Sequence, residues 1–294
     1  MNTTEKFAKW PHLVTLTRIN RPIGIWLLLW PVMWALWLAA SGVPSLSVLV
    51  IFILGTILTR SAGCAINDYA DRHWDGHVKR TENRPLANGN LTPKDALITT
   101  AVLMLAAFVL VLFTNALTIK LSFVALVLAV FYPYTKRITH WPQLFLGLAF
   151  AWAVPMAFAA QSDKLSMTAW IVFVAAVVWA MAYDTFYAMV DRDDDIRVGI
   201  KSTAILFGQY DLAIVGLAQT IMLCLMMVAG HINDRGWVFF IGLCLAGLLV
   251  ARQLHDCRHR DRDECFKAFK DNHKVGLIIF VGLAADYLFK PAGL

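Results

Sequence analysis

Long apolar runs separated by short polar segments dominate this chain. A helix needs about 20 apolar residues to cross the hydrocarbon core of a bilayer. The runs are rich in Leu, Val and Ala and show no alternation of period two, which excludes an outer-membrane β-barrel. The predicted spans are residues 22–40, 46–66, 96–113, 118–134, 142–160, 166–188, 211–229, 236–251 and 275–289. We therefore expect an all-α polytopic membrane protein with nine transmembrane helices.

Composition supports this interpretation. The 294 residues are 59% hydrophobic and only 16% charged, whereas about 25% of the residues of a soluble domain are charged. A soluble fold of this length would lack the polar side chains to cover its surface, so the bilayer must supply much of the surroundings. No linker or low-complexity stretch divides the chain, and we expect residues 1–294 to form a single domain.

The basic residues are unevenly divided between the two sides of the predicted membrane. If the N-terminus is cytoplasmic, nearly all Lys and Arg residues fall on the inner side, and the outer side receives only Lys120, Lys164, Arg235 and Lys290. This is the pattern of the positive-inside rule. The formal net charge of +6 therefore indicates topology rather than nucleic-acid binding. The C-terminus is predicted outside, and residues 1–21 are predicted to lie on the inner membrane surface.

An acidic cluster ends the second predicted span, with the sequence Asn67-Asp68-Tyr69-Ala70-Asp71-Arg72-His73-Trp74-Asp75. On a helix, the spacing of Asp68, Asp71 and Asp75 places the three carboxylates on one face. Carboxylates stacked in this way repel one another, and ionisable groups near the membrane are costly. A bound cation would compensate for both effects.

A second acidic cluster, Asp191-Arg192-Asp193-Asp194-Asp195, ends the sixth predicted span on the same side. Asp191 and Asp195 share a helix face, from which Asp193 points away. Oxygen-only ligand sets suit Mg²⁺, which takes one or two carboxylates and completes its shell with water and phosphate. A solvated acidic helix end is the alternative for either cluster alone. It explains two such clusters less well.

Two Mg²⁺ ions and a diphosphate would leave the acidic clusters with excess negative charge, so nearby cations are needed. Lys and Arg are the expected phosphate-binding residues. The candidates are Lys79, Arg80 and Arg84 after the first cluster, Arg197 and Lys201 after the second, and Lys136 at the end of the fourth span. Tyr132 shares a face with Lys136, and Arg137 could bind an acidic co-substrate. The alternative for these residues, and for Arg18 and Arg21, is membrane-surface anchoring.

These motifs resemble those of the UbiA superfamily of intramembrane aromatic prenyltransferases. Asn67–Asp75 matches its NDxxDxxxD motif, Tyr132–Lys136 matches YxxxK, and Asp191–Asp195 matches DxxxD. The stretches NDYADRHWDGHVKRTENRPL and YDTFYAMVDRDDDIRVGIKSTAILFGQYD are similar to the bacterial branch that prenylates 4-hydroxybenzoate in ubiquinone biosynthesis.

The resemblance implies helices around a central cavity that opens laterally to lipid, in the bacterial inner membrane. It implies Mg²⁺ as cofactor, with a polyprenyl diphosphate (octaprenyl is expected) and 4-hydroxybenzoate as substrates. Neither nucleic acid nor an obligate protein partner is expected. The implied metal and diphosphate residues are Asn67, Asp68, Asp71, Asp75, Asp191 and Asp195, with Asp191 also orienting or deprotonating the phenol. Arg137 is the expected partner of the benzoate carboxylate.

Two other functions stay open at this point. A divalent-cation or anion transporter could use the same acidic helix ends, although its site is expected near the bilayer midplane with broken helices. The acidic residues here lie mostly on one side. A related prenyltransferase could instead act on homogentisate, dihydroxynaphthoate or a porphyrin side chain.

Overall fold

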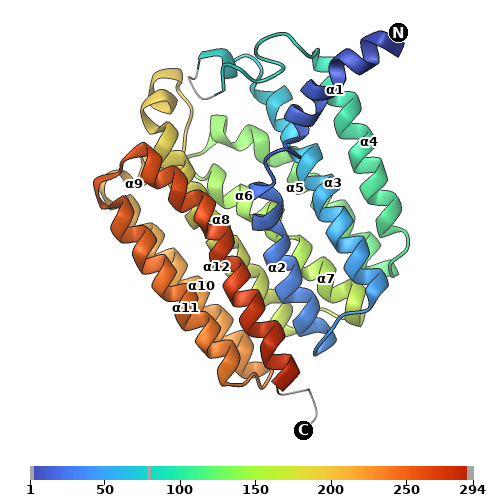
Figure 1. Cartoon of the computed structure of the whole chain (residues 1–294), viewed down its shortest axis with the longest axis vertical. Coiled ribbons are helices and arrows are strands. Elements are labelled where there is room, and N and C mark those ends of the chain that lie inside the picture. The colour runs from blue at the N-terminus through green and yellow to red at the C-terminus, as the bar shows by residue number, and fades with distance from the viewer. Residues whose placement is uncertain (1–2, 78–80, 290–294) are drawn as a thin grey trace.

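The computed structural model describes residues 3–77 and 81–289, and within these ranges every regular element is a helix (Figure 1). The elements are α1 (Thr3–Thr17), α2 (Ile23–Ala40), α3 (Leu46–Asp71), η1 (Asp75–His77), α4 (Pro93–Val111), α5 (Ala116–Ile138), α6 (Pro142–Ala151), α7 (Ala153–Ser162), α8 (Met167–Val198), α9 (Thr203–Phe207), η2 (Gly208–Tyr210), α10 (Asp211–Ile232), α11 (Trp237–Asp256), η3 (Cys257–His259) and α12 (Arg262–Phe289).

The prediction of nine membrane-spanning helices is confirmed for the described residues. α6 and α7 together form one candidate span, and α9, η2 and α10 together form another. Figure 1 shows α1 and the segment after α3 at one end of the bundle, and the C-terminal end of α12 at the opposite end.

Several helices extend beyond the apolar runs that predicted them, and three of these extensions bear on the site. α3 continues to Asp71 and α8 to Val198, so both acidic clusters lie largely on helical turns. The ninth span was predicted from residue 275, but α12 begins at Arg262. Hydropathy detects only the part of a helix that lies in hydrocarbon. The polar turn of α12 is held instead by Arg262, which pairs with Asp193 and Asp194 of α8.

The core lies where α2, α8 and α12 meet. Trp34 of α2 is fully buried, and its ring centroid lies 5.3 Å from that of Trp179 of α8, with the two rings tilted. Its indole N–H donates to the Gly276 carbonyl of α12 at 3.1 Å. A Cβ atom at Gly276 would lie only 2.6 Å from Trp30 Cδ1 and 2.7 Å from Trp179 Cη2. Glycine at this position therefore permits the three helices to pack closely.

A buried amide network ties α12 to three neighbouring helices. The Asn272 Oδ1 atom accepts hydrogen bonds from Trp179 Nε1 at 3.1 Å and Gln219 Nε2 at 3.2 Å. The Asn272 amide also donates to Gln253 Oε1 at 3.2 Å. These bonds join α8, α10, α11 and α12, and such interactions favour one helix register in an apolar interior.

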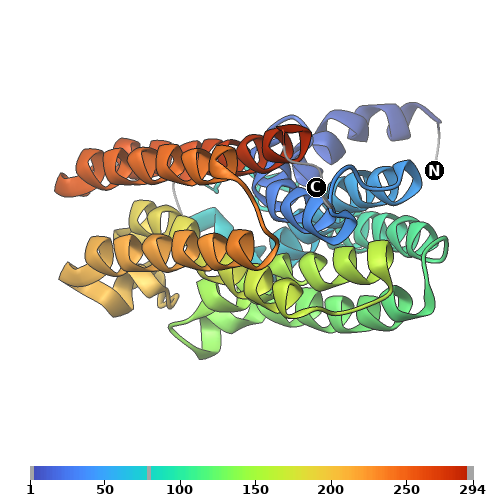
Figure 2. The same cartoon turned by 90° about the horizontal axis from the view of Figure 1, so that it is seen from below.

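The periphery is made by α4 and α5. Only 11% of the span window of each is buried, against 61% for α2 and α8. Figure 2 shows α10–α12 on one side of the bundle and α3 and α4 on the other. The outward side chains of α4 and α5 include Leu97, Ile98, Val102, Leu105, Phe123, Val127, Val130 and Phe131. This rim is suited to contact lipid chains.

Candidate active site

The first acidic motif lies on the last two turns of α3 and the start of η1. The carboxylates of Asp68, Asp71 and Asp75 are all buried. Asn67 Nδ2 donates a hydrogen bond to Asp71 Oδ2 at 3.1 Å, as its spacing of four residues permits. Burial raises the pKa of the Asp75 carboxyl above its ordinary value, and the nearby Arg84 guanidinium opposes this rise.

Cations from distant parts of the chain compensate for the repulsion among these carboxylates. Arg84 Nη1 lies 3.0 Å from Asp68 Oδ1 and 2.8 Å from Asp75 Oδ2, so one guanidinium bridges two acids. Arg18, which follows α1, binds both carboxylate oxygens of Asp68, at 2.8 and 3.2 Å. The predicted diphosphate-binding residues Lys79 and Arg80 lie outside the described residues.

The end of α5 brings the second group of predicted residues to the first motif. Lys136 Nζ pairs with Asp71 Oδ2. The Arg137 guanidinium stacks on Trp74, 4.2 Å from its ring centroid, and donates to the Ala70 carbonyl. Tyr132 lies one turn deeper along α5, with its ring 6.2 Å from that of Phe150.

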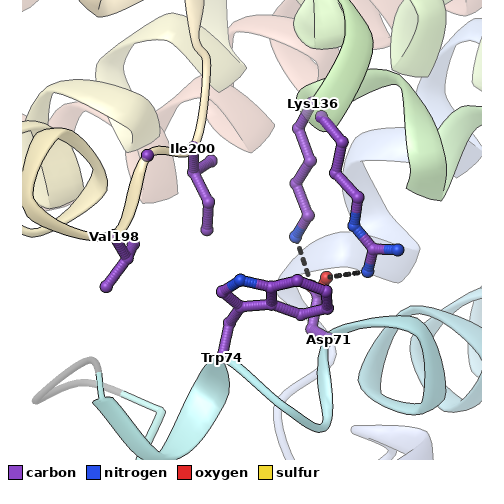
Figure 3. A pocket seen from close by; sticks show the side chains of 7 residues that line it. Asp71, Trp74, Lys136, Val198 and Ile200 are labelled. Atoms are coloured by element: carbon purple, nitrogen blue, oxygen red, sulfur yellow. Dashed lines mark hydrogen bonds and ion pairs between the residues drawn. The ribbon is translucent and has the colours of Figure 1, made fainter.

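A cavity of about 220 Å³ lies where the first motif, the end of α5 and the segment after α8 meet. Figure 3 shows Lys136 and Asp71 pointing toward each other, with Val198 and Ile200 on the facing segment. That segment is joined to α5 by a backbone hydrogen bond from Lys201 N to Lys136 O at 3.0 Å. The Lys201 ammonium donates to the Ile138 carbonyl at 3.1 Å. The cavity lining is Asp71, Trp74, Lys136, Arg137, Val198, Gly199 and Ile200.

The second acidic motif forms the last turns of α8, just before the residues that line this cavity. Asp191 is buried, with an exposed fraction of 8%. Arg192 and the Asp193–Asp194 pair are directed to other parts of the bundle. Arg192 pairs with Asp211 of α10, while Arg262 of α12 binds Asp193 at 3.1 Å and Asp194 at 3.4 Å. Arg192, Asp193 and Asp194 therefore join the end of α8 to α10 and α12.

The donor chemistry at this site fits Mg²⁺, although the described residues contain no group of three His, Cys, Asp or Glu side chains that could hold a metal on its own. Within the same residues, Asp71 Oδ1 is buried without a hydrogen-bond partner, and Arg137 Nη2 lies 3.8 Å away. Mg²⁺ usually takes one or two carboxylates and shares substrate phosphate and water. The separate acidic motifs thus fit an ion whose shell is completed by a diphosphate.

Arg60, a half-buried cation in α3 two turns before Asn67, was not among the predicted site residues. Its guanidinium packs against α2, where a Cβ atom at Gly24 would lie 2.3 Å from Arg60 Nε. Arg60 Nη1 donates to Cys64 Sγ at 2.7 Å, and Phe150 lies 5.7 Å away. The Nε atom is buried and has no hydrogen-bond partner among the described residues. A basic residue inside a span is a sign of function, and this is the sequence signal by which Arg60 could have been found.

Comparison with known proteins places this geometry in context. A model of the UbiA prenyltransferase family matches residues 28–280. The chain is 54% identical over 280 residues to the 4-hydroxybenzoate octaprenyltransferase of Serratia proteamaculans, covering 95% of this chain and 97% of that protein. It is 55% identical over 271 residues to the protein of the same name from Alkalilimnicola ehrlichii, covering 92% of each chain.

Solved structures share the fold. The apo structure of a UbiA homologue from Aeropyrum pernix K1 has a TM-score of 0.78 at 24% identity, covering 90% of this chain and 97% of that chain. A UbiA homologue from Archaeoglobus fulgidus bound to GPP and Mg²⁺ has a TM-score of 0.71 at 14% identity, covering 93% of this chain and 99% of that chain.

Proposed function

Because this chain belongs to the UbiA prenyltransferase family, we propose that it transfers a polyprenyl group to 4-hydroxybenzoate, a membrane step of ubiquinone biosynthesis. The expected donor is octaprenyl diphosphate, and the bond forms at the ring carbon ortho to the hydroxyl. One observation carries the proposal from the structure: Asp71, Lys136 and the segment after Asp195 meet at a single polar cavity. The identity of more than half of the residues to curated octaprenyltransferases supports the choice of substrates.

The polar cavity is suited to hold the diphosphate of the donor. Lys136 and Arg137 place positive charge at the cavity wall, and charge-assisted hydrogen bonds to phosphate are strong. Carboxylates of the two motifs, from Asp68, Asp71, Asp75, Asp191 and Asp195, would hold Mg²⁺. When bound, Mg²⁺ supplies Lewis acidity that offsets the charge developing on the leaving diphosphate.

Bond formation follows from loss of the diphosphate. The allylic C–O bond breaks and its electron pair leaves with the diphosphate, so the first prenyl carbon gains cationic character. The electron-rich ring carbon then forms the new C–C bond and loses its proton. Aromatic faces such as those of Tyr132 and Phe150, one turn deeper, favour positive charge. The apolar helices exclude water that would trap the cation. Asp191 is our candidate to orient the phenol or accept its proton.

Two arginines are candidates for the carboxylate of the acceptor. Arg137 was predicted from sequence, and it lines the cavity. Arg60 is the second candidate, because the Nε atom of its guanidinium is buried and has no hydrogen-bond partner among the described residues. A planar guanidinium can bind a carboxylate in a bidentate manner. Arg60 would place the acceptor deeper, among the apolar helices that hold the prenyl tail.

We place the cavity at the cytoplasmic face of the inner membrane, with the N-terminus on the same side. The division of basic residues between the two sides supports this orientation. A transporter is disfavoured because both acidic motifs gather at one end of the bundle, whereas transport sites lie near the midplane.

The test is an assay of membranes that contain the protein, with labelled polyprenyl diphosphates and a panel of phenolic acids. We expect a prenylated product from 4-hydroxybenzoate with Mg²⁺ present and none after chelation of divalent cations. Product from homogentisate or dihydroxynaphthoate alone would assign the chain to another branch of the family. Uptake of Mg²⁺ by proteoliposomes, without any prenylated product, would support transport instead.

A further inference from the structure

The second acidic motif contains a cation of its own, and the structure directs this cation away from the motif. Arg192 lies three residues before Asp195 on a continuous helix, a spacing at which oppositely charged side chains pair. Yet its Nη2 atom binds Oδ2 of Asp211, the first residue of α10. The contact with Asp211 therefore competes with the ion pair to Asp195 that the helical spacing would permit.

Asp211 is a buried carboxylate that can hold the Arg192 guanidinium in this position. Its carboxylate is 0% exposed, and Leu212 N donates to its Oδ1 atom at 2.6 Å. Arg260, between η3 and α12, binds both oxygens through Nε at 3.0 and 3.2 Å. A buried carboxylate with two guanidinium partners is fixed in position, because its charge is compensated only in that arrangement.

Asp193 and Asp194 of the same motif are also paired with an arginine from another helix. Arg262 of α12 binds Asp193 and Asp194, the two acids that lie between Asp191 and Asp195 in sequence. Arg262 thus holds the end of α8 directly, and Arg260 does so through Asp211, which also binds Arg192. Asp193 and Asp194 act in this scaffold, which agrees with the prediction that Asp193 points away from the face of Asp191 and Asp195.

We propose that Asp211 is a positioning residue of the prenyl transfer, which it serves by keeping the Arg192 guanidinium out of the second acidic motif. The proposal rests on the proposed function. A guanidinium released from Asp211 can pair with Asp195 and compete with the divalent cation for the same oxygens. Since a hydrogen bond to a charged group contributes about 1.5–3 kcal/mol, the affinity for the cation should fall by about tenfold or more.

The experiment measures binding of Mn²⁺, as a spectroscopic substitute for Mg²⁺, to the purified full-length protein. Electron paramagnetic resonance gives the Kd in the presence of an unreactive prenyl thiolodiphosphate. We expect Asp211→Asn to raise the Kd by about tenfold or more. Adding Arg192→Gln to this variant should restore the Kd to within about twofold of the wild type, because no competing cation remains. Asp211→Glu, which keeps the charge, should stay close to the wild type.

A purely structural role for Asp211 predicts the opposite in the double variant. Removing a second scaffold residue would then leave the Kd as weak as in Asp211→Asn or weaker, and our proposal would be overturned. Arg192→Gln alone provides a second test, should Asp211→Asn fail to fold. We expect an unchanged Kd, whereas a tenfold weaker one would show that Arg192 belongs to the binding site.

Controls separate this proposal from stability and from the proposed function. Asp256→Asn removes the ion pair between Arg252 and Asp256 at the C-terminal end of α11, whose charged atoms lie 3.7 Å apart. This variant should change neither the Kd for Mn²⁺ nor the melting temperature. If the wild type binds Mn²⁺ and the analogue but prenylates no phenolic acid, the proposed function fails. If it prenylates 4-hydroxybenzoate while Asp211→Asn binds Mn²⁺ normally, only the role of Asp211 fails.

Discussion

At the residue scale, the acidic site is built from carboxylates whose charge is compensated from far away in the chain. Asp68 binds Arg18 and Arg84, and Asp71 binds Lys136. Removing one partner of a buried ion pair leaves an uncompensated charge, which is costly. Substitutions here should therefore change charge while keeping shape.

We expect Asp71→Asn and Asp191→Asn each to lower turnover by about 100-fold or more, because each removes a carboxylate that would hold the Mg²⁺ needed to offset the charge on the leaving diphosphate. Steady-state assays at limiting Mg²⁺ measure this effect. Asp163→Asn, at the other end of the bundle after α7, should leave turnover unchanged. Near-normal turnover in either motif variant, with the protein correctly inserted, would refute the metal-site hypothesis.

The two candidate arginines predict different kinetics. If Arg137 binds the benzoate carboxylate, Arg137→Ala should raise the KM for the acceptor about 10- to 150-fold and leave the KM for the diphosphate little changed. If the KM for the diphosphate rises instead, Arg137 belongs to the phosphate site. Arg60→Gln should then raise the KM for the acceptor. Arg252→Ala, which removes an exposed cation, is the matched control.

The site residues that could be predicted from the sequence were those that repeat at helical intervals within one segment. Asp71 and Asp75, or Asp191 and Asp195, repeat at helical intervals, so the sequence alone indicates a shared face. Arg60 could not be recognised in this way, since its neighbours Gly24 and Phe150 come from other helices.

At the element scale, α11 and α12 approach each other through glycine. A Cβ atom on Gly242 would lie 3.0 Å from the Gly282 Cα atom, and the reverse distance is the same. Small residues permit such contact between helices in a membrane, where packing rather than water drives association. The sequence predicted both spans, but it does not show which helices pack together, because the two glycines in contact are 40 positions apart.

Gly282→Leu should destabilise the protein, because overpacking a close contact typically costs about 1–3 kcal/mol. We expect a lower midpoint of thermal unfolding in detergent. Gly55→Ala is the control, since a Cβ atom there meets nothing within 4 Å. An unchanged midpoint for Gly282→Leu would mean that α11 and α12 are not tightly packed.

At the scale of the whole molecule, the described residues contain an odd number of candidate spans. The described part of the chain therefore begins and ends at opposite ends of the bundle. The polar cavity and the acidic motifs occupy the end near α1, and α12 finishes at the other end. The number of spans was predictable because hydrocarbon thickness imposes a length on every helix. The cavity could not be predicted from the sequence, since it forms where three helix ends that are distant in sequence meet.

The topology predicts where a reporter can function. A periplasm-dependent reporter fused after Leu294 should be active, and a cytoplasm-dependent one should be inactive, given the distribution of basic residues. Fusions in the segment between α3 and α4 should give the reverse result. Cytoplasmic activity after Leu294 would show that one of the candidate spans does not cross the membrane.

The lipid-facing rim of α4 and α5 affects which measure of substrate concentration sets the rate of the enzyme. The polyprenyl donor and the product are solutes of a two-dimensional solvent, so their effective concentration is a mole fraction in lipid or detergent. Adding inert detergent at constant donor should lower the rate by surface dilution, while the KM for water-soluble 4-hydroxybenzoate stays constant. The amount of donor per membrane area, rather than per cell volume, then sets the rate of the reaction.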